Sequence, residues 1–207
     1  MGCCDDKACA VEALREKQGA TLRTVLVINA AMFVVELAAG LLAGSTALLS
    51  DSLDNLGDAL TYGLSIYAVS KTPRTKAKVA VFKGCLILLA ALFVLAQVGY
   101  RVVHGSTPMF EAMGVVSLLA LFANATCLGL LWRHRTDDVN MSSVWECSRN
   151  DIVGNIAVFV AAGAVWITDT RWPDLVVGLL LSLWLLASSA RVLRTGTAEL
   201  RITPVAP

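Results

Sequence analysis

Long apolar stretches dominate this chain and restrict it to a membrane fold. A helix that crosses a bilayer needs about 20 mostly apolar residues. Six stretches reach that length, at residues 24–44, 47–70, 79–103, 109–133, 141–167 and 173–194. Only 16% of the residues are charged, against roughly 25% in an average globular protein. We therefore expect an all-α membrane protein with six transmembrane helices.

The basic residues predict the orientation of these helices, because Lys and Arg accumulate in cytoplasmic loops. One side of the predicted bundle carries thirteen basic residues and the other only Arg101 and Arg171. Both termini are therefore expected in the cytoplasm. Residues 1–23 would form an N-terminal tail, residues 24–200 the membrane domain and residues 201–207 a short C-terminal tail. No signal peptide is evident, and the cell (inner or plasma) membrane is the expected location.

Charged residues inside the predicted spans are the strongest functional signal. Each costs about 2.5–3.5 kcal/mol at the centre of a membrane helix, so such residues mark functional sites or internal ion pairs. The first span contains Glu36, the second contains three aspartates, and the fifth contains Arg149 and Asp151. The overall net charge is only +1, which gives no reason to expect a nucleic-acid partner.

Spacing brings some of these acids together. Asp54 and Asp58 are four residues apart and share one helix face, and Cys147, Asp151 and Asn155 repeat that spacing in the fifth span. At about 1.5 Å per residue, Asp58 and Asp151 each lie roughly 16 Å from the predicted inner boundary. That depth is near the middle of a hydrocarbon core about 30 Å thick. Two acidic faces can therefore meet at the midplane, where transporters commonly bind substrate.

Clustered carboxylates need compensation by protons or by a cation, because they cannot all stay ionised in a low dielectric. Carboxylates with a thiolate suit a tetrahedral, borderline-soft ion such as Zn²⁺. Protonation of the same groups would release the metal, which is a physical route to exchange of metal for protons.

Two segments resemble the signatures of the cation diffusion facilitator family. They are Ser-Thr-Ala-Leu-Leu-Ser-Asp-Ser-Leu-Asp-Asn-Leu-Gly-Asp at residues 45–58 and Ser-Arg-Asn-Asp-Ile-Val-Gly-Asn at residues 148–155. The resemblance runs from about residue 22 to 200. It implies proton-coupled export of divalent cations from the cytoplasm through a four-residue site. Asp54 and Asp58 match the metal-binding pair of the second span, and Asp151 matches the aspartate of the fifth.

The chain departs from the family pattern in two places. Cys147 occupies the position of the family's fifth-span histidine, so Cys147 and Asn155 remain alternatives for the fourth ligand. The resemblance also implies a form without the C-terminal cytoplasmic domain of typical members. A homodimer is expected from the resemblance.

Other polar residues have less specific interpretations. Asp51 either lines an exit path, where it could also contact metal, or caps the start of its helix. Arg149 is predicted to point away from Asp151 and to act as a counter-charge for Glu36. Lys83, near the inner end of the third span, is expected to extend its ammonium group toward the interface.

The cysteines do not predict a disulfide framework, because none falls in an external loop. Cys85 and Cys127 are interpreted as packing residues. Cys3, Cys4 and Cys9 lie beside two aspartates in the N-terminal tail. This cluster could collect a thiophilic metal ion, or it could be an accidental or redox-exposed group of thiols.

From the sequence we predict a secondary transporter that exports Zn²⁺, with Cd²⁺, Pb²⁺ and Co²⁺ as alternatives, in exchange for protons. No cofactor and no enzymatic activity are expected. The proposed ligands are Asp54, Asp58, Cys147 and Asp151, followed by Asn155, Asp51, Cys3, Cys4 and Cys9. The alternatives are a proton-coupled exporter of small organic cations and a membrane thiol redox or sensor protein.

Overall fold

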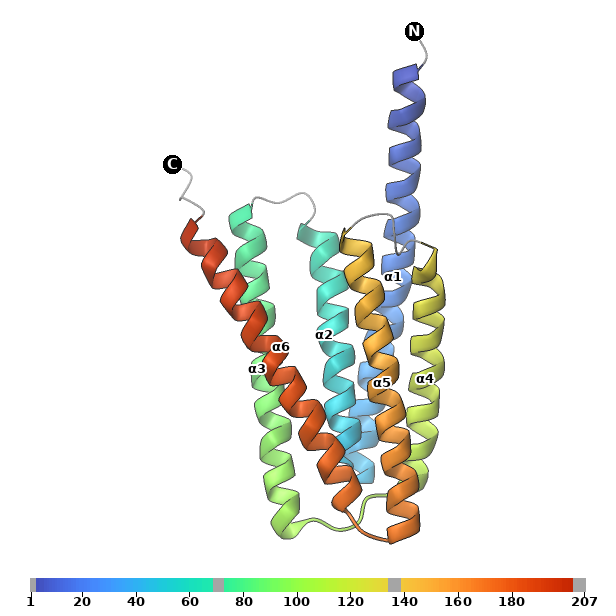
Figure 1. The fold of residues 1–207 in the computed structure, drawn as a ribbon, viewed down its shortest axis with the longest axis vertical. Helices are drawn as coiled ribbons and strands as arrows, with labels where there is room; N and C mark the ends of the chain where they lie inside the picture. Colours follow the sequence, from blue (N-terminus) through green and yellow to red (C-terminus); the bar gives the residue numbers. More distant parts are fainter. Residues whose placement is uncertain (1–2, 69–72, 134–138, 203–207) are drawn as a thin grey trace.

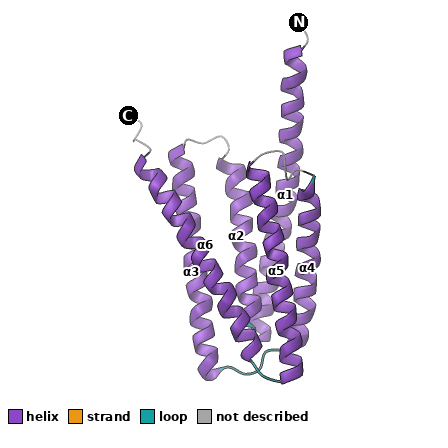
Figure 2. Cartoon of the chain, viewed as in Figure 1, coloured by secondary structure: helices purple, strands orange, loops and turns teal. Residues whose placement is uncertain are grey.

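The computed structural model describes the backbone of residues 3–68, 73–133 and 139–202, and the side chains of residues 19–63, 77–78, 80–133 and 148–201. Within these ranges the chain forms only helices and short loops (Figure 2). The helices are α1 (Cys3–Ala43), α2 (Thr46–Ala68), α3 (Pro73–His104), α4 (Phe110–Trp132), α5 (Val139–Thr168) and α6 (Trp172–Ile202). Five of them, all but α2, are long and apolar enough to cross a membrane. The prediction of an all-α, multi-pass membrane protein is confirmed.

Helix α2 differs in composition because every span-length stretch of it includes Asp51, Asp54 and Asp58. It lies nevertheless at the centre of the bundle, in contact with α1, α3, α5 and α6. Residues of α2 belong to each of the three apolar core clusters, through Leu49, Tyr62 and Leu48 respectively. The surrounding helices therefore screen the aspartates of α2 from lipid, which lowers the cost of carrying them.

Helix α1 begins at Cys3, well before the predicted start of the first span at residue 24. Residues 3–23 contain no proline and one glycine, and they are rich in Ala, Glu, Leu, Lys and Arg, which are good helix formers. The predicted N-terminal tail is therefore helical from Cys3, and α1 projects beyond the other helices (Figure 1). The side chains of Cys3, Cys4 and Cys9 lie outside the described residues.

The six helices are arranged in two groups (Figure 1). Helices α1, α2, α4 and α5 form a four-helix group, in which α1 packs on α2 and α4, and α4 packs on α5. Helices α3 and α6 pack along each other as the α3–α6 pair. Both chain termini lie at the same end of the bundle, the terminal end, and the loops after α1, α3 and α5 lie at the far end.

At the far end, α6 meets α2 through a single buried carboxylate. Asp174, in the first turn of α6, is 1% exposed. Its two oxygens accept hydrogen bonds from the backbone amides of Thr46 and Ala47, at 2.8 and 3.0 Å, and from the hydroxyls of Ser45 and Thr46, at 2.5 and 2.8 Å. The Ser45 hydroxyl oxygen in turn accepts from the amide of Leu48, at 3.1 Å.

These bonds satisfy the amides that begin α2. The first N–H groups of a helix have no partner within the helix and need a capping group. Ser45 supplies the local cap, and Asp174 supplies a negative charge to the same positive helix terminus from a distant part of the sequence. Asp51 lies one turn or more inside α2, so the interpretation of Asp51 as a helix cap is wrong.

The turn before α2 depends on a glycine. Gly44 has φ +69°, which a residue without Cβ adopts at little cost. The amide of Ser45 then donates to the carbonyl of Gly40 at 3.0 Å, as in the helix-ending Schellman motif. This turn delivers Ser45 and Thr46 directly to Asp174.

A seam of small residues continues the contact between α2 and α6. A Cβ atom on Gly178 would lie 2.6 Å from Oγ1 of Thr46, so only glycine allows this approach. One turn further along, the Ser50 hydroxyl donates to the carbonyl of Gly178 at 2.9 Å and lies 2.9 Å from the Ser182 hydroxyl. Small and hydroxylated residues are typical of close helix contacts in membranes.

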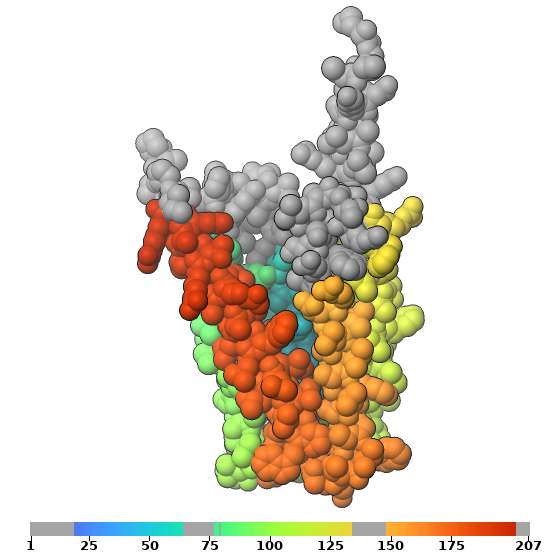
Figure 3. Space-filling model, in the orientation of Figure 1, coloured from blue at the N-terminus to red at the C-terminus, as the bar shows by residue number. Residues whose placement is uncertain are grey.

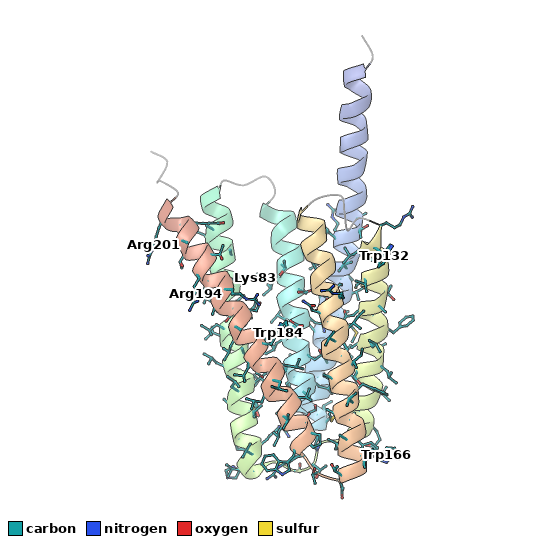
Figure 4. The ribbon with its side chains drawn as sticks, in the orientation of Figure 1. Lys83, Trp132, Trp166, Trp184, Arg194 and Arg201 are labelled. Atoms are coloured by element: carbon teal, nitrogen blue, oxygen red, sulfur yellow. The ribbon has the colours of Figure 1, made fainter. Side chains whose placement is uncertain are left out.

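The surface and the interior have the polarity expected of a membrane protein. Large apolar side chains such as Val115, Phe122 and Leu180 are exposed, whereas Asn29 and Asn124 are fully buried. Trp132 lies at the terminal end and Trp166 at the far end (Figure 4). Both tryptophans are exposed, which is typical of aromatic residues at the two interfaces of a membrane.

Replacing Asp174 by alanine should destabilise the protein by about 2 kcal/mol or more, because four charge-assisted hydrogen bonds to buried donors are lost. A lower melting temperature in detergent would show it. Glu111→Ala is the matched control, since Glu111 also lies in the first turn of a helix but is exposed. It should cost less than about 1 kcal/mol. Equal melting temperatures for the two variants would contradict the role given to Asp174.

Candidate functional site

An open cleft of about 700 Å³ lies between the four-helix group and the α3–α6 pair. Figure 3 shows the hollow between α5 and α6, with atoms of α2 at its floor. Along α6 the cleft extends from Trp184 to Glu199, about 22 Å at 1.5 Å per residue, toward the terminal end. Its lining residues come from α2 (Asp54, Asp58), α3 (Ala80), α5 (Asn150, Asp151) and α6 (Trp184, Ser188, Arg191, Val192, Thr195, Gly196, Glu199).

Three of the four residues proposed as principal metal ligands line this cleft. Asp54 and Asp58 lie on α2 and Asp151 lies on α5. Asp58 and Asp151 are 8% and 6% exposed, and Asp54 is half-buried. The side chain of Asp151 lies close enough to interact with both aspartates of α2. The prediction that two acidic helix faces meet is therefore confirmed for these three carboxylates.

The three carboxylates line one wall of the cleft but do not converge on a single metal-binding position. Among the side chains that the structure describes, no three of His, Cys, Asp and Glu converge closely enough to hold a metal ion. The fourth proposed ligand, Cys147, is part of α5, but its side chain lies outside the described residues. A helix with 3.6 residues per turn brings residue 147 onto the face of Asp151, one turn closer to the terminal end.

Asp58 has a fixed orientation that sequence reasoning did not foresee. The hydroxyl of Tyr62 donates a hydrogen bond of 2.6 Å to Oδ2 of Asp58. Tyr62 is 1% exposed and packs with Val25, Cys127 and Leu131. The spacing of four residues between Asp58 and Tyr62 was a usable signal, because it brings a phenol above the carboxylate on one helix face.

Asn155 and Asp51 lie behind the cleft rather than in its lining. Asn155 is fully buried, and its amide donates to the carbonyl of Asp151 at 2.6 Å. Asp51 is also buried, and its Oδ1 lies 3.3 Å from the position of a Cβ on Gly154, so α2 and α5 approach closely there. Neither residue is among the side chains that line the cleft.

Glu36 joins this buried layer. It is 0% exposed, and its Oε2 accepts a hydrogen bond of 2.9 Å from the amide of Asn55. Arg149, the counter-charge expected for Glu36, is exposed on α5. The partner of Glu36 in the structure is therefore an uncharged amide from α2, which sequence reasoning missed.

The buried layer contains more hydrogen-bond acceptors than donors. One oxygen each of Glu36, Asp51, Asn55 and Asn155 has no hydrogen-bond partner among the described residues. Buried polar atoms normally have partners, and uncompensated oxygens favour the approach of protons or cations. The interior next to the cleft is therefore suited to positive charge.

Other polar residues lie away from the cleft, and of the two cysteines interpreted as packing residues only Cys127 is buried. The amide of Asn29 donates to the carbonyl of Val25 at 2.9 Å and lies 3.9 Å from the sulfur of Cys127. Cys127 is buried, whereas Cys85 is exposed on α3. Arg171 donates to the carbonyls of Gly105 and Val102, so it satisfies the end of α3.

Comparison with known protein families covers the segments that form the cleft. A family model described as the cation efflux transmembrane domain matches residues 22–201. The chain belongs to this family. The match covers most of the length of the chain and all six helices, and it agrees with the resemblance found in the sequence. The family is defined by the movement of cations, in keeping with the prediction that the chain is not an enzyme.

Individual relatives share between 23% and 30% of their residues with this chain. The metal cation efflux system protein CzcD of Cupriavidus metallidurans is 26% identical over 200 residues, which are 86% of this chain and 63% of that protein. The zinc transporter ZitB of Yersinia pestis is 23% identical over 186 residues, or 84% and 60% of the two chains. An uncharacterized transporter of Synechocystis is 30% identical over 200 residues, or 86% and 61%. The chain spans about three fifths of the length of these relatives.

Replacing Tyr62 by phenylalanine should loosen Asp58 without opening a cavity. The loss of one hydrogen bond to a charged group, worth about 1.5–3 kcal/mol, predicts weaker binding of metal by about ten-fold. Titration of purified protein with Zn²⁺ would measure it. Tyr100→Phe, on the exposed face of α3, serves as the control and should bind as the wild type does. Unchanged affinity in Tyr62→Phe would contradict the orienting role.

Proposed function

We propose that this protein exports divalent metal cations from the cytoplasm by proton antiport, with Zn²⁺ as the principal substrate and Cd²⁺, Pb²⁺ and Co²⁺ as alternatives. The observation that carries the proposal is the cleft lined by Asp54, Asp58 and Asp151. Buried carboxylates from two helices attract a divalent cation strongly in a low dielectric. The names of CzcD and ZitB, which refer to metal cation efflux and to zinc, support the substrate class.

The proposed topology has six spans with both termini in the cytoplasm. The thirteen basic residues on one side of the bundle support this orientation through the positive-inside rule. Arg194 and Arg201, two of the thirteen, lie toward the terminal end (Figure 4). With this orientation the cleft is open to the cytoplasm, as an exporter requires when it takes up its substrate. The protein would function in the cell membrane, as a homodimer by analogy with the family.

Cys147 is proposed as the fourth ligand in preference to Asn155. The amide of Asn155 is already bonded to the carbonyl of Asp151, and the residue is fully buried behind the cleft. Position 147 precedes Asp151 by one helical turn, on the side toward the cleft opening. A thiolate at that position would favour soft and borderline ions. Cys3, Cys4 and Cys9 would at most deliver metal to the cleft.

Removing the charge of Asp54 or Asp151 should abolish transport. In proteoliposomes supplied with Zn²⁺, Asp54→Asn and Asp151→Asn should each lower the initial rate by at least about a hundred-fold. The reason is that the isosteric amides keep the shape of the site but lose the attraction for the cation. Glu111→Gln, an exposed acid on α4, should transport as the wild type does.

The same assay separates the alternatives. Metal flux that persists in both variants would contradict the proposed site. An exporter of organic cations would show no metal flux in the wild type, and a thiol sensor would be insensitive to both aspartate substitutions. A pH dye trapped in the vesicles would report the protons exchanged, and metal flux without a pH change would contradict antiport.

Replacing Cys147 by alanine should change metal preference more than activity. Loss of a thiolate ligand predicts a fall in Cd²⁺ transport of at least about ten-fold, with Zn²⁺ transport reduced less than about three-fold, because softer ions depend more on sulfur. Cys85→Ala is the matched control, since Cys85 is an exposed free cysteine on α3. Equal losses for both metals would show that Cys147 does not set selectivity.

A further inference from the structure

Lys83 reaches into the bundle instead of toward the membrane interface. The residue is half-buried on α3, and its ammonium group donates a hydrogen bond to Oγ1 of Thr61 on α2. Figure 4 shows the side chain extending from α3 toward α2. The expectation that Lys83 directs its ammonium to the interface is therefore wrong. A polar partner inside the bundle outweighs the interface for this side chain.

Thr61 holds the ammonium next to the acidic wall of the cleft. Thr61 follows Asp58 by three residues, so the two side chains are neighbours on one face of α2. The Thr61 hydroxyl donates to the carbonyl of Gly57 at 2.7 Å, which leaves its oxygen free to accept from Lys83. The ammonium of Lys83 lies close enough to attract the carboxylates of both Asp54 and Asp58.

The arrangement changes the charge that a metal ion encounters. Asp54, Asp58 and Asp151 carry three negative charges when ionised, and Lys83 carries one positive charge. The sum for these four groups is −2, before any contribution from a Cys147 thiolate. Arg191 and Glu199 also line the cleft, but both are exposed, and solvent screens their opposite charges more strongly.

We propose that Lys83 is a tethered counter-cation that competes with the transported metal for Asp54 and Asp58. This inference rests on the proposed function. In the metal-free cleft the ammonium stabilises the carboxylate pair, and a divalent ion must overcome this attraction when it binds. Lys83 thereby weakens metal binding and hastens metal release. It acts as a positioning residue, since it adjusts the ligands and does not bind the metal.

The test compares metal affinity and transport in four proteins: the wild type, Lys83→Met, Lys83→Arg and Lys78→Met. Lys83→Met keeps an unbranched side chain but removes the charge. It should bind Zn²⁺ about ten-fold more tightly, because a competing positive charge is gone. In proteoliposomes its KM should fall, and its kcat should fall because release becomes slower.

The controls separate charge from packing. Lys83→Arg keeps the positive charge and should stay within about three-fold of the wild type in affinity. Lys78 is an exposed lysine on the same helix, and Lys78→Met should have no effect. Thr61→Val removes the hydroxyl that holds the ammonium and should shift affinity in the same direction as Lys83→Met, by a smaller factor. If Lys83→Met does not fold, the affinity of Thr61→Val tests the proposal in its place.

The outcomes distinguish this inference from the proposed function. A wild type that binds no metal would overturn both. A wild type that binds metal, together with a folded Lys83→Met whose affinity is unchanged or weaker, would overturn the counter-cation alone. A purely structural role for Lys83 predicts weaker binding and a lower melting temperature, so tighter binding with lower turnover supports the competing charge.

Discussion

The bonds between Asp174 and the start of α2 join α6 to the four-helix group at the far end of the bundle. Asp174 belongs to the α3–α6 pair, and its carboxylate is the cap of the central helix of the four-helix group. Below this cap, Gly178 allows α6 to approach Thr46 closely. Toward the terminal end α6 diverges from α2 and remains on α3 (Figure 1). The cleft opens between α5 and α6 because α6 contacts α2 closely only near the far end.

The capped start of α2 also determines which side chains enter the interior. Because α2 begins at Thr46, Asp51, Asn55 and Asp58 lie at successive turns and point into the bundle, where all three are buried. Asn55 donates to Glu36, and Asp58 accepts from Tyr62. This interior is rich in oxygen acceptors with few donors, and an environment of that kind stabilises positive charge. The same helix therefore carries both the structural anchor and the acidic wall of the cleft.

Much of this arrangement could be predicted from the sequence, and the part that could not has a physical reason. Helix number and the pairing of Asp54 with Asp58 follow from local periodicity, and the approach of Asp151 follows from its depth in an antiparallel span. The roles of Asp174 and Lys83 depend on contacts between segments more than 20 residues apart, as with Lys83 and Thr61. Sequence spacing carries no information on such contacts. An aspartate after Pro173 reads as an ordinary first-turn acid until α2 is found beside it.

Opposite charges lie on the two groups of helices, so a movement of one group against the other would change the affinity of the cleft for metal. The three carboxylates belong to the four-helix group, whereas Lys83 and Arg191 belong to the α3–α6 pair. Attraction between opposite charges falls with separation and rises as water is excluded. Any movement of the pair against the group therefore changes the cationic charge near Asp54 and Asp58, and with it the affinity of the cleft for a metal ion. Such a movement would alter both the opening of the cleft and its affinity, the two changes that a transporter must couple.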